Sequence, residues 1–187
     1  MYYADSSILI SYLFTSEVNH RVSRRILEDI AIGKKTKIYV SSLTLLEVYN
    51  ALCRKIVKEK EWRLIEPIQW YVNGYKSSED KCRELSAIAI NILKERLGIE
   101  FVDHEELYEF VESNFNKYII PRIFKDALML SPKLNIRVKD LLHLVYAHSL
   151  SDKYKIEFFL TCDIEDFGKI KDIVKNMLKI NIEIVKA

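Results

Sequence analysis

The segment TCDIEDF places three acidic residues directly after an apolar run, IEFFL. A turn at the end of a strand needs only one small polar residue, so Asp163, Glu165 and Asp166 exceed what a turn requires. Another acid, Asp5, follows the apolar opening MYYA in the same way. The function of these carboxylates depends on whether the fold brings them to one place.

Two further acids, Glu47 and Asp140, lie near the starts of helical patterns, in LTLLEV and VKDLLHL. In an open parallel sheet, ligands bind outside the carboxyl ends of the strands, where helices begin. Carboxylates gathered there repel one another and raise one another's pKa values unless a cation relieves the repulsion. Hard oxygen ligands suit Mg²⁺ or Mn²⁺, and paired ions of this kind align and activate water for phosphodiester hydrolysis. The acids therefore predict a metal-dependent nuclease or phosphatase.

Each acid also has a purely structural interpretation. Asp5 and Asp163 can be helix N-caps or turn residues. Glu47 ends the sequence TLLE, which fits a capping box, and Asp140 can complement a helix dipole. These interpretations explain the acids one at a time, but not their shared position at one edge of a sheet.

The elements that must position these acids alternate between short apolar segments and helical patterns. Several apolar segments lack the alternation of apolar and polar residues that a strand with one solvated face would have. This indicates an α/β fold, with a mostly parallel sheet of about four or five strands and helices on both faces. Pro132 and Asn135 are expected in a loop. The expected strands are 1–4, 37–40, 99–102, 157–161 and 180–185, and the expected helices are 6–14, 19–32, 42–57, an irregular 58–76, 78–97, two within 104–130 that break near Pro121, 139–150 and 166–178.

At 187 residues and 49% hydrophobic, the chain is long enough for one domain, which we expect over 1–187. The formal net charge of +2 means that any basic surface is local. Apolar runs are short and broken by charge, so we expect no membrane span, no signal peptide and a cytoplasmic protein. Cys53, Cys82 and Cys162 are widely spaced, which predicts reduced thiols. Lys, Glu and Ile are abundant and Gln69 is the only glutamine, a bias found in thermophilic proteins.

The four acidic segments resemble the motifs of PIN-domain proteins, especially the VapC-type ribonuclease toxins. The matching segments are YYADSSILISYL, VSSLTLLEVYNAL, IRVKDLLHLVYA and FLTCDIEDF. Their order and context match: strand then acid, helix start with Glu, helix start with Asp, and strand then Thr-x-Asp with a downstream Asp-Phe. The chain is longer than small members of the toxin group, and the excess falls in a helical elaboration around 56–133.

The resemblance implies hydrolysis of RNA by a metal-activated water that Glu47 positions, with Mg²⁺ or Mn²⁺ as cofactor. It also implies which residues form the acidic pocket. The catalytic set is Asp5, Glu47, Asp140 and Asp163, and the metal ligands are Asp5, Asp140, Asp163 and Asp166.

Other residues around this pocket have two interpretations each. Ser6 and Thr161 would orient ligating carboxylates, but both hydroxyls can equally be capping groups. Arg137 and Lys139 flank Asp140 and would hold substrate phosphates, or they are solvated residues at a helix start. His143 lies one turn after Asp140, where it can touch the pocket or simply pack between helices.

Two functions of different classes follow from these interpretations. The first is a metal-dependent endoribonuclease, either the toxin of a type II toxin–antitoxin pair or an RNA-processing enzyme. The alternative is a catalytically weak or inactive PIN-like module that binds protein or RNA. A toxin would have a cognate antitoxin that inserts an arginine into the acidic pocket, and homodimerisation is expected on the same resemblance.

Overall fold

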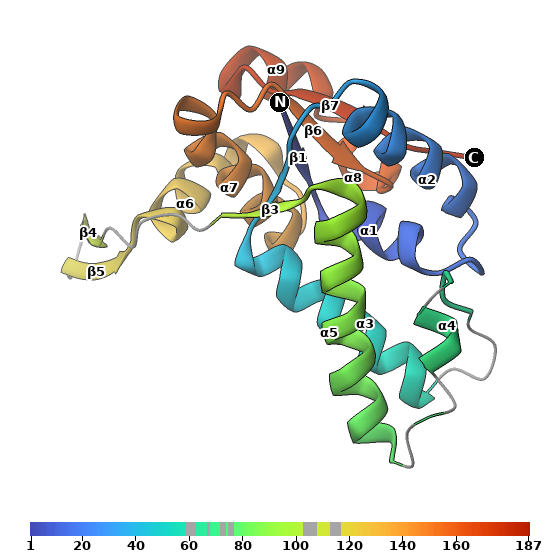
Figure 1. Ribbon diagram of the computed structural model, residues 1–187. Helices are drawn as coiled ribbons and strands as arrows, with labels where there is room; N and C mark the ends of the chain where they lie inside the picture. The colour runs from blue at the N-terminus through green and yellow to red at the C-terminus, as the bar shows by residue number, and fades with distance from the viewer. Residues whose placement is uncertain (59–62, 67, 72–73, 75–76, 103–107, 113–116) are drawn as a thin grey trace.

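A five-stranded parallel sheet forms the centre of the computed structural model (Figure 1). The strand order is β3-β2-β1-β6-β7, which confirms the expected α/β class and each predicted strand. The strands are β1 (Tyr2–Ala4), β2 (Ile38–Val40), β3 (Glu100–Phe101), β6 (Phe158–Thr161) and β7 (Asn181–Ile184). The structure describes residues 1–58, 63–66, 68–71, 74, 77–102, 108–112 and 117–187.

Helices cover both faces of this sheet, because successive strand residues point to opposite sides. Tyr2 and Ala4 of β1 belong to one apolar core, while Tyr3 between them belongs to the other. The first core is covered by α1 (Ser6–Leu13), α2 (His20–Glu28), the π-helix η1 (Asp29–Gly33), α3 (Ser42–Lys58), α4 (Ile68–Tyr71) and α5 (Ser78–Leu97), and the second by α6 (Arg122–Leu134), α7 (Val138–Tyr154), α8 (Ile164–Phe167) and α9 (Lys171–Leu178).

The side on which successive strands are added to the sheet changes between β1 and β6. From β1 the chain builds β2 and then β3 on one side, whereas β7 is added to β6 on the other side. Ligands of open α/β sheets bind in the crevice outside the carboxyl ends of the strands at such a switch point. The residues that directly follow β1 and β6 are therefore the ones best placed to meet a ligand.

Of the two helices predicted within 104–130, the second is present as α6, which begins directly after the predicted break at Pro121. In place of the first lies an antiparallel hairpin of β4 (Tyr108–Glu112) and β5 (Lys117–Pro121), which projects from the domain (Figure 1). The elaboration around 56–133 is thus not wholly helical. The sequences YEFVE and KYIIP are rich in aromatic and β-branched residues, which favour strands. Parts of the predicted segments 58–76 and 104–130 lie outside the described residues.

Helix α6 also differs from the expectation, because it runs through Pro132 instead of stopping before it. Proline lacks an amide hydrogen and costs one helical hydrogen bond, but here it lies in the last turn. The helix ends at Asn135, whose left-handed backbone (φ 48°) closes it. The predicted loop therefore begins at Asn135.

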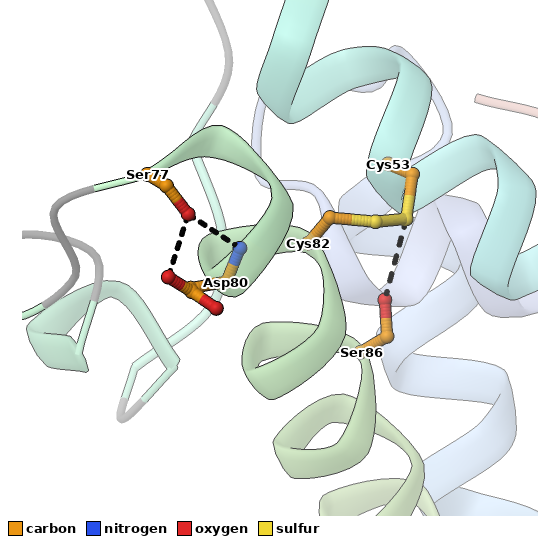
Figure 2. The surroundings of a disulfide bond; sticks show 5 residues. All are labelled: Cys53, Ser77, Asp80, Cys82 and Ser86. Carbon is orange, nitrogen blue, oxygen red and sulfur yellow. Dashed lines mark hydrogen bonds between the residues drawn. A yellow bond between two sulfur atoms is a disulfide. The ribbon is translucent and has the colours of Figure 1, made fainter.

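Helices α3 and α5 extend side by side away from the sheet (Figure 1), and a disulfide between Cys53 and Cys82 joins them (Figure 2). The Cα atoms of Cys53 and Cys82 are 4.8 Å apart. The prediction of reduced thiols is wrong for this pair, because it relied on sequence spacing and could not foresee that α3 packs on α5. Cys162 is a free thiol. Disulfides are rare in cytosolic proteins, with hyperthermophiles as the exception, and the composition of this chain has a thermophilic bias.

Candidate active site

Asp5 directly follows β1 and is the N-cap of α1. Its Oδ1 accepts hydrogen bonds from the backbone nitrogens of Ser7 at 2.9 Å and Ile8 at 3.2 Å, and from Oγ of Ser7 at 2.6 Å. Only 3% of the residue is exposed. Burial raises the pKa of Asp5 above its ordinary value, although these hydrogen bonds oppose the rise. The structural interpretation of Asp5 as a cap is correct, and it does not exclude a second role.

Thr161, the last residue of β6, connects Asp5 with Asp163. Its buried hydroxyl donates to Oδ2 of Asp5 at 2.6 Å and accepts from the backbone nitrogen of Asp163 at 3.0 Å. The hydroxyl therefore fixes the orientation of one carboxylate and the start of the turn that carries the next. This is the position in which the sequence predicted an orienting residue.

Asp163 is the N-cap of the short helix α8. Its Oδ1 accepts from the backbone nitrogens of Glu165 at 3.0 Å and Asp166 at 3.2 Å. After α8 comes Gly168, where an added Cβ would lie 2.5 Å from the carbonyl oxygen of Ile164. A larger residue there would displace α8, and with it the carboxylates that α8 positions.

Three carboxylates meet at this point: Asp163, Asp166 and Asp140, which lies in the first turn of α7. One carboxylate oxygen of each lies within 4.8 Å of the other two. We call these three residues the acidic cluster. Asp5, which the sequence also predicted as a metal ligand, is not one of these three, and its two oxygens accept hydrogen bonds from Ser7, Ile8 and Thr161.

Arg137, immediately before α7, partly compensates the negative charge of the cluster. Its guanidinium nitrogens hydrogen-bond to Oδ2 of Asp163 and of Asp166, and Nε lies 3.0 Å from Oδ2 of Asp140. The sequence predicted that Arg137 holds substrate phosphates, whereas here it is ion-paired with the acids. Lys139 is exposed, and its charge acts on Glu47 and Asp140.

The pKa values of two carboxyl groups in the cluster shift in opposite directions. Burial, together with the contact to Asp166, raises the pKa of Asp140 to about 6. Desolvation is the largest influence on Asp166 and also acts upward, but the hydrogen bonds with Arg137 and Asp140 and the charge of Arg137 together outweigh it and hold the pKa of Asp166 below its ordinary value. Like charges at short distance produce such a split, and a cation that neutralises all three carboxylates would remove it.

Glu47 projects from the second turn of α3 and accepts two hydrogen bonds at Oε2. One comes from Oγ of Ser6, the residue after Asp5, and the other involves Nε2 of His143 at 2.8 Å. Burial alone would raise the pKa of Glu47, but these hydrogen bonds lower it to about 2. Helix α3 begins at Ser42, and Oγ of Ser41 accepts from the Thr44 nitrogen at 3.4 Å. Glu47 is therefore not part of a capping box.

The acidic cluster fits a divalent cation. Its donors are all hard carboxylate oxygens, which Mg²⁺ and Mn²⁺ prefer. Among the described residues, Oδ2 of Asp140 is buried and accepts no well-aligned hydrogen bond, although it is ion-paired with Nε of Arg137 at 3.0 Å. A bound cation would give this oxygen a further partner. The cluster is already occupied by a cationic group, the Arg137 guanidinium. It is thus built to hold positive charge.

The chain is thus an α/β domain in which acids gather near the switch point of a parallel sheet. Residues 2–173 match the PIN domain, and the chain belongs to this family. PIN domains are generally nucleases, and PIN nucleases typically use divalent metals. No curated protein matches this chain. Within the part of the chain that the structure describes, no helix has both the length and the apolar character needed to cross a membrane.

Proposed function

We propose that this protein is a metal-dependent endoribonuclease that hydrolyses the phosphodiester bonds of RNA. The observation that carries the proposal is the acidic cluster, three carboxylates within 4.8 Å of one another at the switch point of the sheet. The ionised carboxylate of Glu47, hydrogen-bonded to the residue after Asp5, supports it. Membership of the PIN family adds a nuclease precedent.

Asp140, Asp163 and Asp166 would hold the ion, with Asp5 maintaining the connection between β1, α1 and Thr161. A bound divalent ion would stabilise the charge that develops on the phosphate and increase the acidity of a bound water. Arg137, once released from the acids, lies at the rim of the cluster with Lys139. Both side chains can then contact phosphates, as proposed from the sequence.

Glu47 would orient the attacking water. A carboxylate with a pKa of about 2 is a poor proton acceptor at neutral pH, so its role is to accept a hydrogen bond and aim the water oxygen at phosphorus. As the new O–P bond forms, the bond from phosphorus to one neighbouring nucleoside oxygen breaks. The proton of the water passes to solvent, and the leaving oxygen takes one from solvent.

The test is cleavage of a labelled single-stranded RNA by purified protein in Mn²⁺ or Mg²⁺, compared with EDTA. Asp140→Asn and Asp163→Asn should each abolish cleavage. Glu165→Gln is the matched control, because it removes an exposed acid of α8 that lies outside the cluster. Cleavage that survives in EDTA, or in either cluster variant, would contradict the proposal and indicate a contaminating nuclease.

Metal binding distinguishes the enzyme from a PIN-like module that only binds protein or RNA. At a Mn²⁺ concentration 100 times Kd, binding to the folded state adds about 2.7 kcal/mol. For a chain of this size, that corresponds to a Tm rise of roughly 5–10 °C. A rise lost in Asp163→Asn is expected of an intact site. No rise and no cleavage would favour the module.

The role as a toxin is a finer proposal within the same function. The cluster accepts a guanidinium from Arg137, so an antitoxin arginine could form the same pairs. Co-purification of a small partner encoded beside this chain would support a toxin, and its absence would favour RNA processing. Homodimerisation can be measured in the same preparation by light scattering.

A further inference from the structure

A chain of buried polar groups lies behind Glu47 and links three elements. His143 of α7 is 1% exposed and sits between Glu47 of α3 and Tyr3 of β1. Its Nε2 is 2.8 Å from Oε2 of Glu47, and its Nδ1 is 3.2 Å from the hydroxyl of Tyr3. That hydroxyl is in turn 2.7 Å from Oγ of Ser41, the residue before α3. The polar chain therefore begins in the core and ends at a carboxylate of the proposed active site.

The ionised state of Glu47 limits how protons can be arranged along this chain while the imidazole is neutral. An ionised Glu47 can only accept, so Nε2 of His143 carries the hydrogen and Nδ1 is the acceptor. Two hydroxyls can donate to Nδ1, that of Tyr3 at 3.2 Å and that of Thr44 at 3.5 Å, and Tyr3 is the nearer. Burial raises the pKa of Tyr3, which keeps its hydroxyl protonated and able to donate. The Tyr3 oxygen is left to accept from Ser41. Tyr3 thus selects the tautomer of His143 that can donate to Glu47.

Packing alone does not explain a histidine at this position. The adjacent buried residues of α7 are apolar, including Leu141, Leu144 and Val145, and an apolar side chain would fill the same volume without needing two buried partners. Among the described residues, Oε1 of Glu47 takes part in no hydrogen bond, whereas Oε2 receives both Ser6 and His143. One oxygen is thereby anchored and the other is left for a water molecule.

We propose that His143 is a positioning residue for hydrolysis, which holds the Glu47 carboxylate in the orientation that aims the attacking water. Tyr3 supports it by fixing the tautomer. This inference rests on the proposed function and adds a residue that touches neither the substrate nor the ion. Among the described residues, His143 makes no hydrogen bond to a member of the acidic cluster, so it should affect the rate of the chemical step rather than the binding of metal or RNA.

The experiment compares His143→Leu with His143→Gln, whose amide nitrogen can donate near the position of Nε2. Removal of a supporting hydrogen bond typically costs about 10–100-fold. We expect kcat of His143→Leu to fall by that factor, with KM for RNA and the Mn²⁺-induced Tm rise unchanged within twofold. His143→Gln should recover most of the loss, and Tyr3→Phe should cause a smaller one. His148→Leu is the matched control, because His148 is exposed on the same helix.

Several outcomes would overturn the inference. If His143→Leu keeps the wild-type kcat, Glu47 does not need the imidazole. If the Leu and Gln variants lose kcat and the Mn²⁺ response together, His143 is structural. A wild-type protein that cleaves no RNA removes the proposed function and the catalytic part of this inference.

A second readout distinguishes these failures without using activity. Nitrogen-15 NMR of the metal-free protein should show His143 as the Nε2–H tautomer at neutral pH, with Tyr3→Phe weakening that preference. If RNA is not cleaved but the tautomer is found, the contact with Glu47 exists and only the proposed reaction is wrong. An Nδ1–H tautomer contradicts the positioning role directly.

Discussion

The two ends of α3 show how differently one helix can be fixed. In its second turn, Glu47 is held by hydrogen bonds from Ser6 and His143, in a half-buried polar environment. Towards its other end, Cys53 is joined covalently to α5 (Figure 2). The first attachment depends on protonation and on nearby charge, whereas the second depends on redox conditions. Function and stability should therefore respond to different changes in this protein.

The largest expected effect is the loss of RNA cleavage in a variant of the acidic cluster that keeps its stability. Asp163→Asn should reduce RNA cleavage by more than about 100-fold, since removing a ligand should cost at least as much as removing a supporting residue. The Tm in EDTA should stay close to that of the wild type, because the amide oxygen of the new side chain can still cap α8. Cleavage assays and thermal melts on the same preparation check both statements. A variant that simply unfolds would contradict the separation.

At the other end of α3, loss of the disulfide should lower stability and spare catalysis. The bond closes a loop with a sequence separation of 29, and disulfides of this kind typically contribute about 2–4 kcal/mol. Cys53→Ser combined with Cys82→Ser should lower Tm by roughly 4–16 °C and leave kcat at 25 °C within twofold. A reductant should lower the Tm of the wild type and of Cys162→Ser, but not of the double variant.

A smaller effect is expected from Arg137, which competes with any cation for the cluster. Arg137→Ala should lower the Tm in EDTA by a few degrees, because the three carboxylates then repel one another without compensation. The same variant should show a larger Mn²⁺-induced Tm rise than the wild type. Arg25→Ala, an exposed arginine of α2, is the control. An equal or smaller metal response would show that Arg137 does not oppose metal binding.

The smallest effect is a pH dependence of stability in EDTA. The pKa of Asp140 is about 6 in the folded protein, above the ordinary value of 3.8. The stability that the protonated carboxyl of Asp140 adds to the folded protein is therefore fully present below about pH 4, and it is lost as the pH rises through 6. Asp140→Asn should remove this decline, which urea unfolding from pH 4 to pH 7 can measure. Because a metal requires the ionised form, Mn²⁺ stabilisation should grow over the same range.

The sequence was sufficient to predict the central sheet and the positions of the acids around it. Buried parallel strands carry short, uniform apolar runs, so IEFV and EFFLT were identifiable, and an acid after such a run lies at the carboxyl edge by necessity. Thr161 was predicted between the acids for the same reason. The roles of these residues in metal binding and catalysis stay predictions.

What the sequence did not predict depends on contacts between distant elements. Arg137 was assigned to phosphates because only its neighbour Asp140 was visible, while its partners Asp163 and Asp166 lie more than twenty residues away. His143 left two interpretations open, since its contact with Glu47 requires α3 and α7 to meet. The hairpin was missed because the whole span from His104 was interpreted with a single helical period.

The central place of β1 in the sheet has a consequence for the timing of folding. Asp5 is made before its hydrogen-bond partner Thr161, which lies 156 positions later in the chain. At a synthesis rate of about 5–20 residues per second, the ribosome needs roughly 8–31 seconds to pass from Asp5 to Thr161. The acidic cluster likewise needs Asp163 and Asp166, so the proposed active site cannot assemble until the segment that carries α8 has been synthesised.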